Sequence, residues 1–278
     1  MVINVNKMIK FIINTIIDKT YETKLGTFFI NKLCSNFMSQ TTIVVHDNLS
    51  LEFATPNPTS KWRAKTFSFK EPETLQWIDE MKEDSCFWDV GANIGLYTIY
   101  AAKTKKIKVY AFEPSVFNLE LLSRNINLNK VEDKIRIVTM AISDKNGFSM
   151  LSHTTKEWGG ALSVFGEEFG SDGNRVKTKF KYLALGMKAD DFLKLEGFIQ
   201  PDYIKIDVDG IEHLILSKAC EILLNVKSVL VEINEDFTEQ LVKSDKILKK
   251  AGLNLKSKNR TSPLTSKTPN VFNQIWIR

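Results

Sequence analysis

Short apolar runs alternate with longer amphipathic segments over most of the chain after residue 80. The runs have the length of buried strands, and helical stripes at i, i+3 and i+4 fill most of the intervals between them. Parallel strands joined by helices form βαβ units with right-handed crossovers. The pattern therefore predicts an α/β fold with a mostly parallel sheet, whose strands cover residues 86–90, 108–112, 135–142, 203–208, 227–233, 253–255 and 271–277.

Residues 1–40 follow a different pattern, with many Ile and Phe residues at helical spacing. They predict one or two amphipathic helices, and no apolar stretch reaches the ~18–20 residues that span a bilayer. We expect these helices to pack on the core or on a second subunit of a homodimer. Weak contact with a membrane surface is the alternative, because lysines lie beside the apolar face, at Lys7, Lys10, Lys19 and Lys24.

The next segment contains strand-like pieces at residues 42–45 and 51–54, followed by a loop marked by Pro56 and Pro58. A helix is predicted to begin in residues 71–78, where proline and acidic side chains suit a first turn. We therefore predict an N-terminal extension over residues 1–60 and the main domain over residues 61–278.

Composition and charge are those of an ordinary globular protein, with 43% hydrophobic residues and a formal net charge of +5. The lysines are dispersed or in short clusters, so we expect solvated faces and no nucleic-acid partner. The three cysteines (Cys34, Cys86 and Cys220) are isolated in the sequence, which argues against a disulfide framework and a thiolate metal site. Such cysteine usage suits a reducing compartment, and we expect a cytoplasmic protein.

A glycine-bounded turn follows the strand predicted at residues 86–90. Gly91 and Gly95 delimit it, Asp89 precedes it, and Glu113 ends the next predicted strand. A carboxylate at that strand end can accept hydrogen bonds from both hydroxyls of a ribose. The alternative is a purely structural role, in which Asp89 and Gly91 only shape a tight turn. The position of Glu113 favours a nucleoside-cofactor site instead.

The turn also indicates which cofactor would bind. A dinucleotide site requires Gly-x-Gly-x-x-Gly, because the backbone must approach a pyrophosphate, and this turn lacks the third glycine. Asp89 would repel a pyrophosphate but could hold an ammonium group. S-adenosylmethionine offers an ammonium, a carboxylate and a ribose, and backbone N–H groups at the following helix start could meet its carboxylate. The pattern therefore favours S-adenosylmethionine over a dehydrogenase cofactor.

The strand predicted at residues 135–142 ends where an open parallel sheet places its ligands. Contacts with adenine from Ala141, Ile142 and Ser143 are one interpretation, and a plain strand terminus is nearly as well supported. Residues 145–182 are less regular and contain several glycines, so they form a candidate substrate loop.

Four ionisable residues cluster at the end of the strand predicted at residues 203–208, where a helix begins: Asp207, Asp209, Glu212 and His213. One of them could be the general base that takes a hydroxyl proton. The carboxylates could instead hold Mg²⁺, although the sequence alone does not support a metal site. A structural alternative is a capping box formed by Asp209 and Glu212. His213 could equally be a packed histidine, and Asp207 is the strongest candidate for function.

Lys205 lies in the same strand, with two interpretations open. Its head could be exposed at the end of a strand side chain, or it could pair with a carboxylate or a substrate. A helix is predicted from residue 211 to residue 223.

The ordered motifs resemble the FkbM-type S-adenosylmethionine-dependent methyltransferases. The resemblance covers roughly residues 60–278, and its carriers are Phe-Lys-Glu-Pro-Glu-Thr-Leu-Gln-Trp-Ile (69–78), Asp-Val-Gly-Ala-Asn-Ile-Gly (89–95), Ala-Phe-Glu-Pro (111–114), Ala-Ile-Ser-Asp (141–144) and Ile-Lys-Ile-Asp-Val-Asp-Gly-Ile-Glu-His-Leu-Ile-Leu (204–216). The chain departs from the family pattern at Asp209, where Glu is usual, and at Lys218-Ala219, where Gly-Ala is usual.

The resemblance implies a Rossmann-like class I methyltransferase with a seven-stranded sheet whose last strand is antiparallel. It also implies cofactor contacts from Asp89, Gly91, Asn93 and Glu113, with Gly95 closing the same motif. Members with a similar Lys-Glu-Pro segment look like those that accompany polysaccharide synthesis. We therefore expect O-methylation of a sugar hydroxyl in a polysaccharide, a glycolipid or a related natural product.

Two other readings remain open. A protein or nucleic-acid methyltransferase is the first, although the Ile-Asp-Val-Asp-Gly strand end lacks the Asn/Asp-Pro-Pro-aromatic stretch that would stack on a flipped base. A non-catalytic cofactor-binding scaffold protein is the second, and the presence of Gly91, Glu113 and Asp207 together argues against it.

Overall fold

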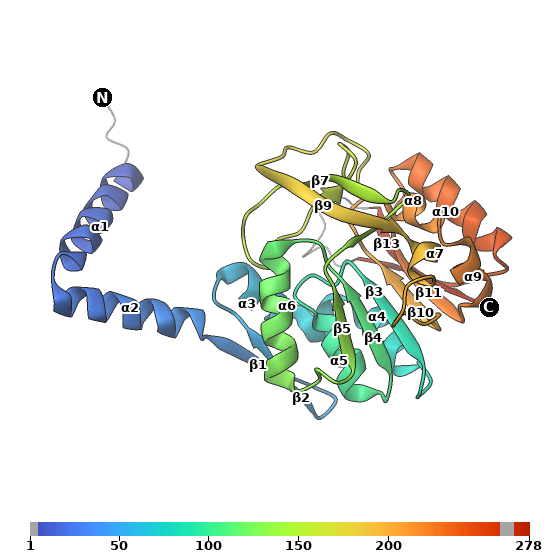
Figure 1. The fold of residues 1–278 in the computed structure, drawn as a ribbon, viewed down its shortest axis with the longest axis horizontal. Helices are drawn as coiled ribbons and strands as arrows, with labels where there is room; N and C mark the ends of the chain where they lie inside the picture. Colours follow the sequence, from blue (N-terminus) through green and yellow to red (C-terminus); the bar gives the residue numbers. More distant parts are fainter. Residues whose placement is uncertain (1–4, 262–269) are drawn as a thin grey trace. The chain divides into compact units, whose positions relative to one another are not determined.

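The computed structural model describes residues 5–261 and 270–278, and it divides into two compact units, one ending at Thr41 and one over Thr42–Arg278. Figure 1 shows the elements of both units as a ribbon, coloured along the sequence. The predicted boundary between residues 60 and 61 stays a prediction. The sequence also predicts a loop between the last two strands, with prolines at positions 263 and 269, and these prolines lie outside the described residues.

The N-terminal unit consists of two helices, α1 (Val5–Tyr21) and α2 (Lys24–Met38), which confirms the predicted helical segment. Thr23 caps α2, because its side-chain oxygen accepts a hydrogen bond from the Gly26 N–H at 3.0 Å. Large apolar side chains are exposed on both helices, and α2 has no buried residue. No helix in the described parts of the chain combines the length and the apolar character needed to cross a membrane.

The main unit is built on a seven-stranded sheet in the order β12-β13-β11-β10-β3-β4-β5. Neighbours from β11 to β5 are parallel, and β13 runs antiparallel to both β11 and β12. The strands are β3 (Cys86–Val90), β4 (Lys108–Phe112), β5 (Ile135–Val138), β10 (Tyr203–Ile206), β11 (Ser228–Asn234), β12 (Asn254–Arg260) and β13 (Val271–Ile277). The predicted seven-stranded sheet with an antiparallel last strand is confirmed.

Strand residues alternate between two hydrophobic clusters, because successive side chains of a strand point to opposite faces. In β3, Phe87 belongs to one cluster and Trp88 to the other, and Ala111 and Phe112 divide in the same way in β4. Helices α4 (Pro72–Asp79), α5 (Leu96–Thr104) and α6 (Val116–Asn129) supply the first cluster. Helices α7 (Ala189–Phe192), α8 (Glu212–Leu216), α9 (Cys220–Asn225) and α10 (Thr238–Lys250) supply the second, so α6 and α10 lie on opposite sides of the sheet (Figure 1).

A second sheet has four strands in the order β6-β9-β7-β8. They are β6 (Ala141–Ser143), β7 (Gly147–His153), β8 (Ser163–Phe165) and β9 (Phe180–Lys188). The prediction of one strand over residues 135–142 was wrong, because the chain leaves the large sheet after Val138 and pairs Ala141 with Gly186 of β9. Both halves are apolar, so the pattern did not mark the change of sheet.

The start of the main unit forms a hairpin and a helix. Strands β1 (Thr41–His46) and β2 (Leu49–Ala54) join through Asp47 and Asn48, which both have positive φ, as a two-residue type I′ turn requires. The prediction of a loop was wrong at Pro58, because helix α3 (Pro58–Lys70) begins at this residue. Asn57 and Ser60 form its capping box, and proline is favourable in a first turn.

Candidate active site

Two cavities open at the carboxyl ends of the central parallel strands, where ligands bind in open α/β sheets. Val90 of β3 lies beside Ile206 of β10 in register, so Gly91 and Asp207 emerge together. The first cavity has an empty volume of about 550 Å³, and the second about 920 Å³. Five residues line both cavities: Gly91, Asn93, Ala161, Asp207 and Asp209.

Glycine is required at both ends of the turn after β3, for different reasons. Gly91 has φ +85°, and a Cβ there would lie 2.0 Å from the backbone oxygen of Asp207. Gly95 has φ +84°, and its Cβ would lie 2.5 Å from the Leu122 side chain on α6. Gly91 lines both cavities and Gly95 lines neither. Gly91 thus permits the close approach of the turn after β3 to the Asp207 backbone, whereas Gly95 permits the packing of α5 on α6.

Glu113 lies at the end of β4, lines the first cavity and is 5% exposed. Its two carboxylate oxygens accept hydrogen bonds from the backbone N–H groups of Asn93 and Ser115, each at 2.8 Å. Burial raises the pKa of Glu113 to about 7, against these hydrogen bonds. The Asn118 side chain also forms a hydrogen bond with this carboxylate, and a remaining lone pair could accept from a ribose hydroxyl.

The N–H of Asn93 is thus used by Glu113 inside the protein. The Asn93 side-chain amide donates a hydrogen bond to the backbone oxygen of Gly160 at 2.9 Å. This contact fixes the loop that lies between the two cavities.

The apolar wall of the first cavity includes Ala141 and Ile142, and their contact with adenine stays a prediction. Ser143 does not line the cavity. It is buried, and its hydroxyl donates to the Asp144 carboxylate at 3.2 Å. The sequence reasoning missed Met140 and Phe165, which also line the cavity. Phe165 belongs to β8 of the second sheet, and no local pattern relates it to the glycine turn.

Asp89 lies beneath the site and not on its surface. It is 1% exposed, lines neither cavity, and accepts a hydrogen bond from the Thr98 hydroxyl at 2.5 Å. Burial raises its pKa, and the neighbouring Lys205 acts in the opposite direction. A contact between Asp89 and the ammonium of a cofactor stays a prediction.

The residues of the first cavity fit S-adenosylmethionine. Glu113 suits the ribose, the wall around Ile142 suits a purine, and the site has no phosphate-binding glycine pattern. The side-chain oxygen of Asn118, which lines the same cavity, is buried and has no partner in the described structure. A buried amide oxygen without a donor suits a ligand that supplies one.

Asp207 and Asp209 lie where the two cavities meet. Asp207 forms an ion pair with Lys205 at 2.7 Å. Asp209 has φ +63°, and its carboxylate accepts a hydrogen bond from the Leu162 N–H at 2.6 Å. Burial, followed by the charge of Asp207, raises the pKa of Asp209 to about 6.

The capping box expected between Asp209 and Glu212 was wrong. Helix α8 begins at Glu212 with Ile211 before it, and the single helix predicted over residues 211–223 is divided into α8 and α9.

Glu212 and His213 are both buried and line neither cavity. Glu212 accepts hydrogen bonds from the N–H groups of Val208 and Gly210, at 3.0 and 3.1 Å, and from the Gln240 amide. Burial raises the pKa of Glu212 to about 7. The His213 ring lies 5.4 Å from the Phe237 ring between centroids, and burial lowers its pKa.

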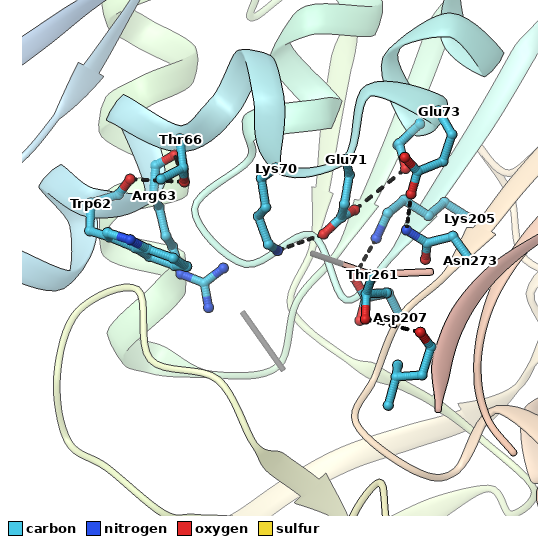
Figure 2. A network of polar contacts seen from close by, with 12 residues as sticks. Trp62, Arg63, Thr66, Lys70, Glu71, Glu73, Lys205, Asp207, Thr261 and Asn273 are labelled. Carbon is cyan, nitrogen blue, oxygen red and sulfur yellow. Dashed lines mark hydrogen bonds and ion pairs between the residues drawn. The ribbon is translucent and has the colours of Figure 1, made fainter. Parts of the chain in front are cut away.

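A network of buried charges supports the second cavity (Figure 2). Lys205 is 1% exposed, so the interpretation of an exposed head was wrong, and the carboxylate partner is Asp207. Burial lowers the pKa of Lys205, but the charges of Asp207, Asp89 and Glu71 outweigh it and raise the pKa. Burial raises the pKa of Glu71, but Lys70, which pairs with it at 2.6 Å, and Lys205 bring it down to about 2.

A group of three carboxylates could hold a divalent cation. One oxygen each from Asp207, Asp209 and Glu232 lies within 4.8 Å of the others. Carboxylate oxygens are the ligands that Mg²⁺ prefers. Burial and then the charge of Asp207 raise the pKa of Glu232 well above its usual range, as expected where carboxylates share one space.

The sheet order, with β13 inserted antiparallel between β11 and β12, and the acidic residue after β4 define a Rossmann-like class I methyltransferase fold. A family model described as Methyltransferase FkbM domain matches residues 89–253, which is more than half of the chain. The chain belongs to this family.

Two curated relatives are methyltransferases. Over 174 residues the chain is 25% identical to the hexuronic acid methyltransferase AglP of Haloferax volcanii, covering 62% of this chain and 66% of AglP. Over 149 residues it is 28% identical to the methyltransferase sdnD of Sordaria araneosa, covering 46% of this chain and 58% of sdnD. The chain therefore spans less than two thirds of the length of either relative.

Solved structures with a similar arrangement include TYW2 of P. horikoshii in complex with MeSAdo and TYW2 of M. jannaschii in complex with AdoMet. The first has a TM-score of 0.45 and 16% identity, and covers 86% of this chain and 70% of that chain. The second has a TM-score of 0.44 and 14% identity, and covers 86% of each chain.

Proposed function

We propose that this protein transfers a methyl group from S-adenosylmethionine to a hydroxyl group of a sugar. The observation that carries the proposal is the meeting of the two cavities at Asp207 and Asp209. The first cavity has the residues for the cofactor and the second is open to an acceptor. A reaction between two bound molecules requires such a junction, because most of the rate gain comes from holding the reacting atoms in line.

In this proposal Glu113 binds the ribose, the wall of Ala141, Ile142 and Met140 covers the adenine, and Asn118 accepts a hydrogen bond from the cofactor. The bound cofactor supplies an electrophilic methyl group on sulfur. The ionised carboxylate of Glu113 is the stronger acceptor, so cofactor binding should strengthen as the pH rises through about 7.

We assign the general base to Asp209, with Asp207 as the positioning residue. Both line the junction, but the Asp207 carboxylate is already engaged in an ion pair with the Lys205 ammonium at 2.7 Å. Asp209 has no such ion pair within the described residues, and its pKa of about 6 suits a base that is ionised at neutral pH. This reverses the order of preference that the sequence suggested.

We assign structural roles to Glu212 and His213. The Glu212 carboxylate satisfies backbone N–H groups of the turn that carries Asp207 and Asp209, so it holds both in place. His213 packs among aromatic rings, outside the lining of both cavities.

The second cavity supports a sugar acceptor. It is lined by polar and charged side chains together with the Trp62 indole, a combination that suits a ring carrying many hydroxyls. The relative AglP is named for its action on a hexuronic acid, which is a sugar. We infer that the acceptor hydroxyl belongs to a polysaccharide, a glycolipid or a related natural product.

The test is transfer of labelled methyl from S-adenosylmethionine into host extract, which is then separated into glycan, lipid, protein and nucleic acid. We expect label in glycan or glycolipid, and no label with Asp209→Asn. Label in protein or nucleic acid would overturn the proposal that the acceptor is a sugar. Cofactor binding without transfer to any fraction would favour a scaffold protein.

A second arm of the same assay includes EDTA. Loss of transfer that Mg²⁺ restores would make Asp207, Asp209 and Glu232 metal ligands. Transfer that EDTA leaves unchanged would exclude a metal requirement.

A further inference from the structure

One wall of the second cavity is made by consecutive residues of helix α3. Trp62 is 38% exposed and Arg63 is half-buried, and both line the cavity. Figure 2 shows the Trp62 indole and the Arg63 guanidinium projecting side by side from α3. Three carboxylates line the same cavity, those of Asp207, Asp209 and Glu232.

The cations near this cavity differ in how their charge is balanced. Lys70 pairs with Glu71 at 2.6 Å, and Lys205 pairs with Asp207 at 2.7 Å. Arg63 donates through Nε to the backbone oxygen of Gly159 at 2.5 Å. Its terminal nitrogens have no hydrogen bond or ion pair within the described parts of the chain, and it acts on Asp209 only through space, lowering the pKa of that carboxyl.

The backbone around Arg63 fixes where this charge lies. The loop that accepts its Nε–H is tied to the start of α3 at two further points. The Asn57 amide donates to the Trp158 backbone oxygen at 3.1 Å, and the Thr59 hydroxyl donates to the Glu157 carboxylate at 2.6 Å. The guanidinium is therefore held before any ligand arrives, with its Nη donors left for a partner. A half-buried guanidinium of this kind suits bidentate binding of a carboxylate or a phosphate.

We infer that the second cavity takes an acidic sugar, whose ring lies on Trp62 and whose anionic group is bound by Arg63. The inference rests on the proposed function and narrows its acceptor class. A carboxylate or a phosphate on the ring would supply the same chemistry. The methylated hydroxyl then lies across the cavity, on the side of Asp207 and Asp209.

The test measures binding separately from transfer. Saturation-transfer NMR and calorimetry on the full chain, with S-adenosylhomocysteine present, compare methyl glucuronoside, glucose 6-phosphate and methyl glucoside. We expect the anionic sugars to bind about tenfold or more tightly than the neutral one, as for a charged hydrogen-bonded pair. The tighter of the two anionic sugars identifies carboxylate or phosphate.

Variants assign that preference to residues. Arg63→Gln should remove most of the preference for anionic sugars, and Arg63→Lys should keep part of it. Trp62→Ala should weaken the binding of all three sugars. Lys65→Gln is the control, because Lys65 is an exposed cation on the same helix and lines neither cavity. Binding of S-adenosylhomocysteine, measured in parallel, should be unchanged in all of them.

Three results would each overturn the inference. The first is equal binding of neutral and anionic sugars, and the second is a preference for anionic sugars that survives Arg63→Gln. The third is no binding of any sugar while S-adenosylhomocysteine still binds. A failure of this inference can be distinguished from a failure of the proposed function. Transfer to a neutral sugar that Arg63→Gln does not affect would retain the function and reject the acidic acceptor. Arg63-dependent binding of acidic sugars without any methyl transfer would retain the site and reject the reaction.

Discussion

At the scale of single residues, the site depends on three carboxylates that lie in different surroundings. Glu113, Asp207 and Asp209 follow two strands of one sheet, yet their environments differ. Glu113 is buried among backbone N–H groups, Asp207 is paired with a lysine, and Asp209 accepts from backbone N–H groups of a loop. Groups of the same chemical type can therefore serve in different roles at one pH.

Asp209→Asn should reduce methyl transfer by about 10²–10⁴-fold, the usual contribution of a general base. The carboxylate works only when ionised, so kcat of the unaltered protein should fall as the pH drops through about 6. The measurement is kcat against pH at saturating cofactor, where titration of Glu113 in the free site does not interfere. Asp133→Asn, at an exposed position, is the control. If Asp207→Asn removed the acidic limb while Asp209→Asn kept it, the base would be Asp207.

Glu113→Gln should raise the Kd for S-adenosylmethionine by about 10–100-fold at pH 8, because hydrogen bonds to an ionised carboxylate are lost. Its pKa of about 7 predicts that the effect shrinks below pH 7, where the carboxyl is protonated in the free protein. Calorimetry at pH 6 and pH 8 measures both effects. Glu196→Gln makes the same chemical change at an exposed site and should leave Kd unchanged. An equal Kd for Glu113→Gln at pH 8 would contradict the assignment of the ribose contact.

At the scale of elements, turns and caps decide where the reactive side chains emerge. The turn after β3 must pass under the Asp207 backbone, which only a residue without Cβ can do. The turn after β10 is held by Glu212, whose carboxylate binds the N–H groups of Val208 and Gly210. The junction of the two cavities thus lies on two tight turns, one requiring glycine and the other a buried acid.

Gly91→Ala and Gly197→Ala form a matched pair for the first of these turns. Both positions have positive φ, +85° and +90°, so each substitution incurs the backbone cost of about 1–2 kcal/mol. A Cβ at Gly197 meets nothing within 4 Å, whereas one at Gly91 would lie 2.0 Å from the Asp207 oxygen. We expect Gly91→Ala to lower the free energy of unfolding clearly more than Gly197→Ala, as measured by urea denaturation. Equal losses would mean that the turn after β3 does not approach the Asp207 backbone so closely.

At the scale of the whole molecule, the two units differ in how they bury apolar surface. Both hydrophobic clusters of the main unit are made of residues from Val44 onward, and they occupy both faces of the large sheet. The helices α1 and α2 instead carry exposed apolar side chains, among them Phe11, Leu25 and Phe28. Exposed apolar surface of this kind marks an interaction site, so the expected contacts with the core, a second subunit or a membrane surface stay predictions.

Deletion of residues 1–40 should leave the free energy of unfolding of the remaining chain nearly unchanged, because the main unit has its own core. It should also reduce self-association, because the exposed apolar side chains are removed. Urea denaturation and analytical ultracentrifugation measure the two effects. The full-length chain with Phe11→Ser and Phe28→Ser is the control, and it should lose self-association although both helical segments are still present. A large loss of stability in the truncated chain would instead show that α1 and α2 pack on the core.

The sequence alone determined the features that depend on neighbouring residues. These local features are the periods of strands and helices, the glycine turn after residue 90 and the carboxylate at Glu113. They were enough to predict the large sheet and the position of the first cavity. The same patterns could not show that the strand predicted at residues 135–142 belongs to two sheets, since both halves are apolar.

Tertiary structure decided everything that depends on distant segments meeting. Arg63 is joined to Gly159, and Lys205 lies in a buried network with Glu71, although each pair is far apart in sequence. These contacts place Arg63 in the lining of the second cavity and bury Lys205, and with them we propose Asp209 as the base in place of Asp207. The physical reason is that burial and charge pairing depend on which side chains surround a group, and its sequence neighbours do not specify them.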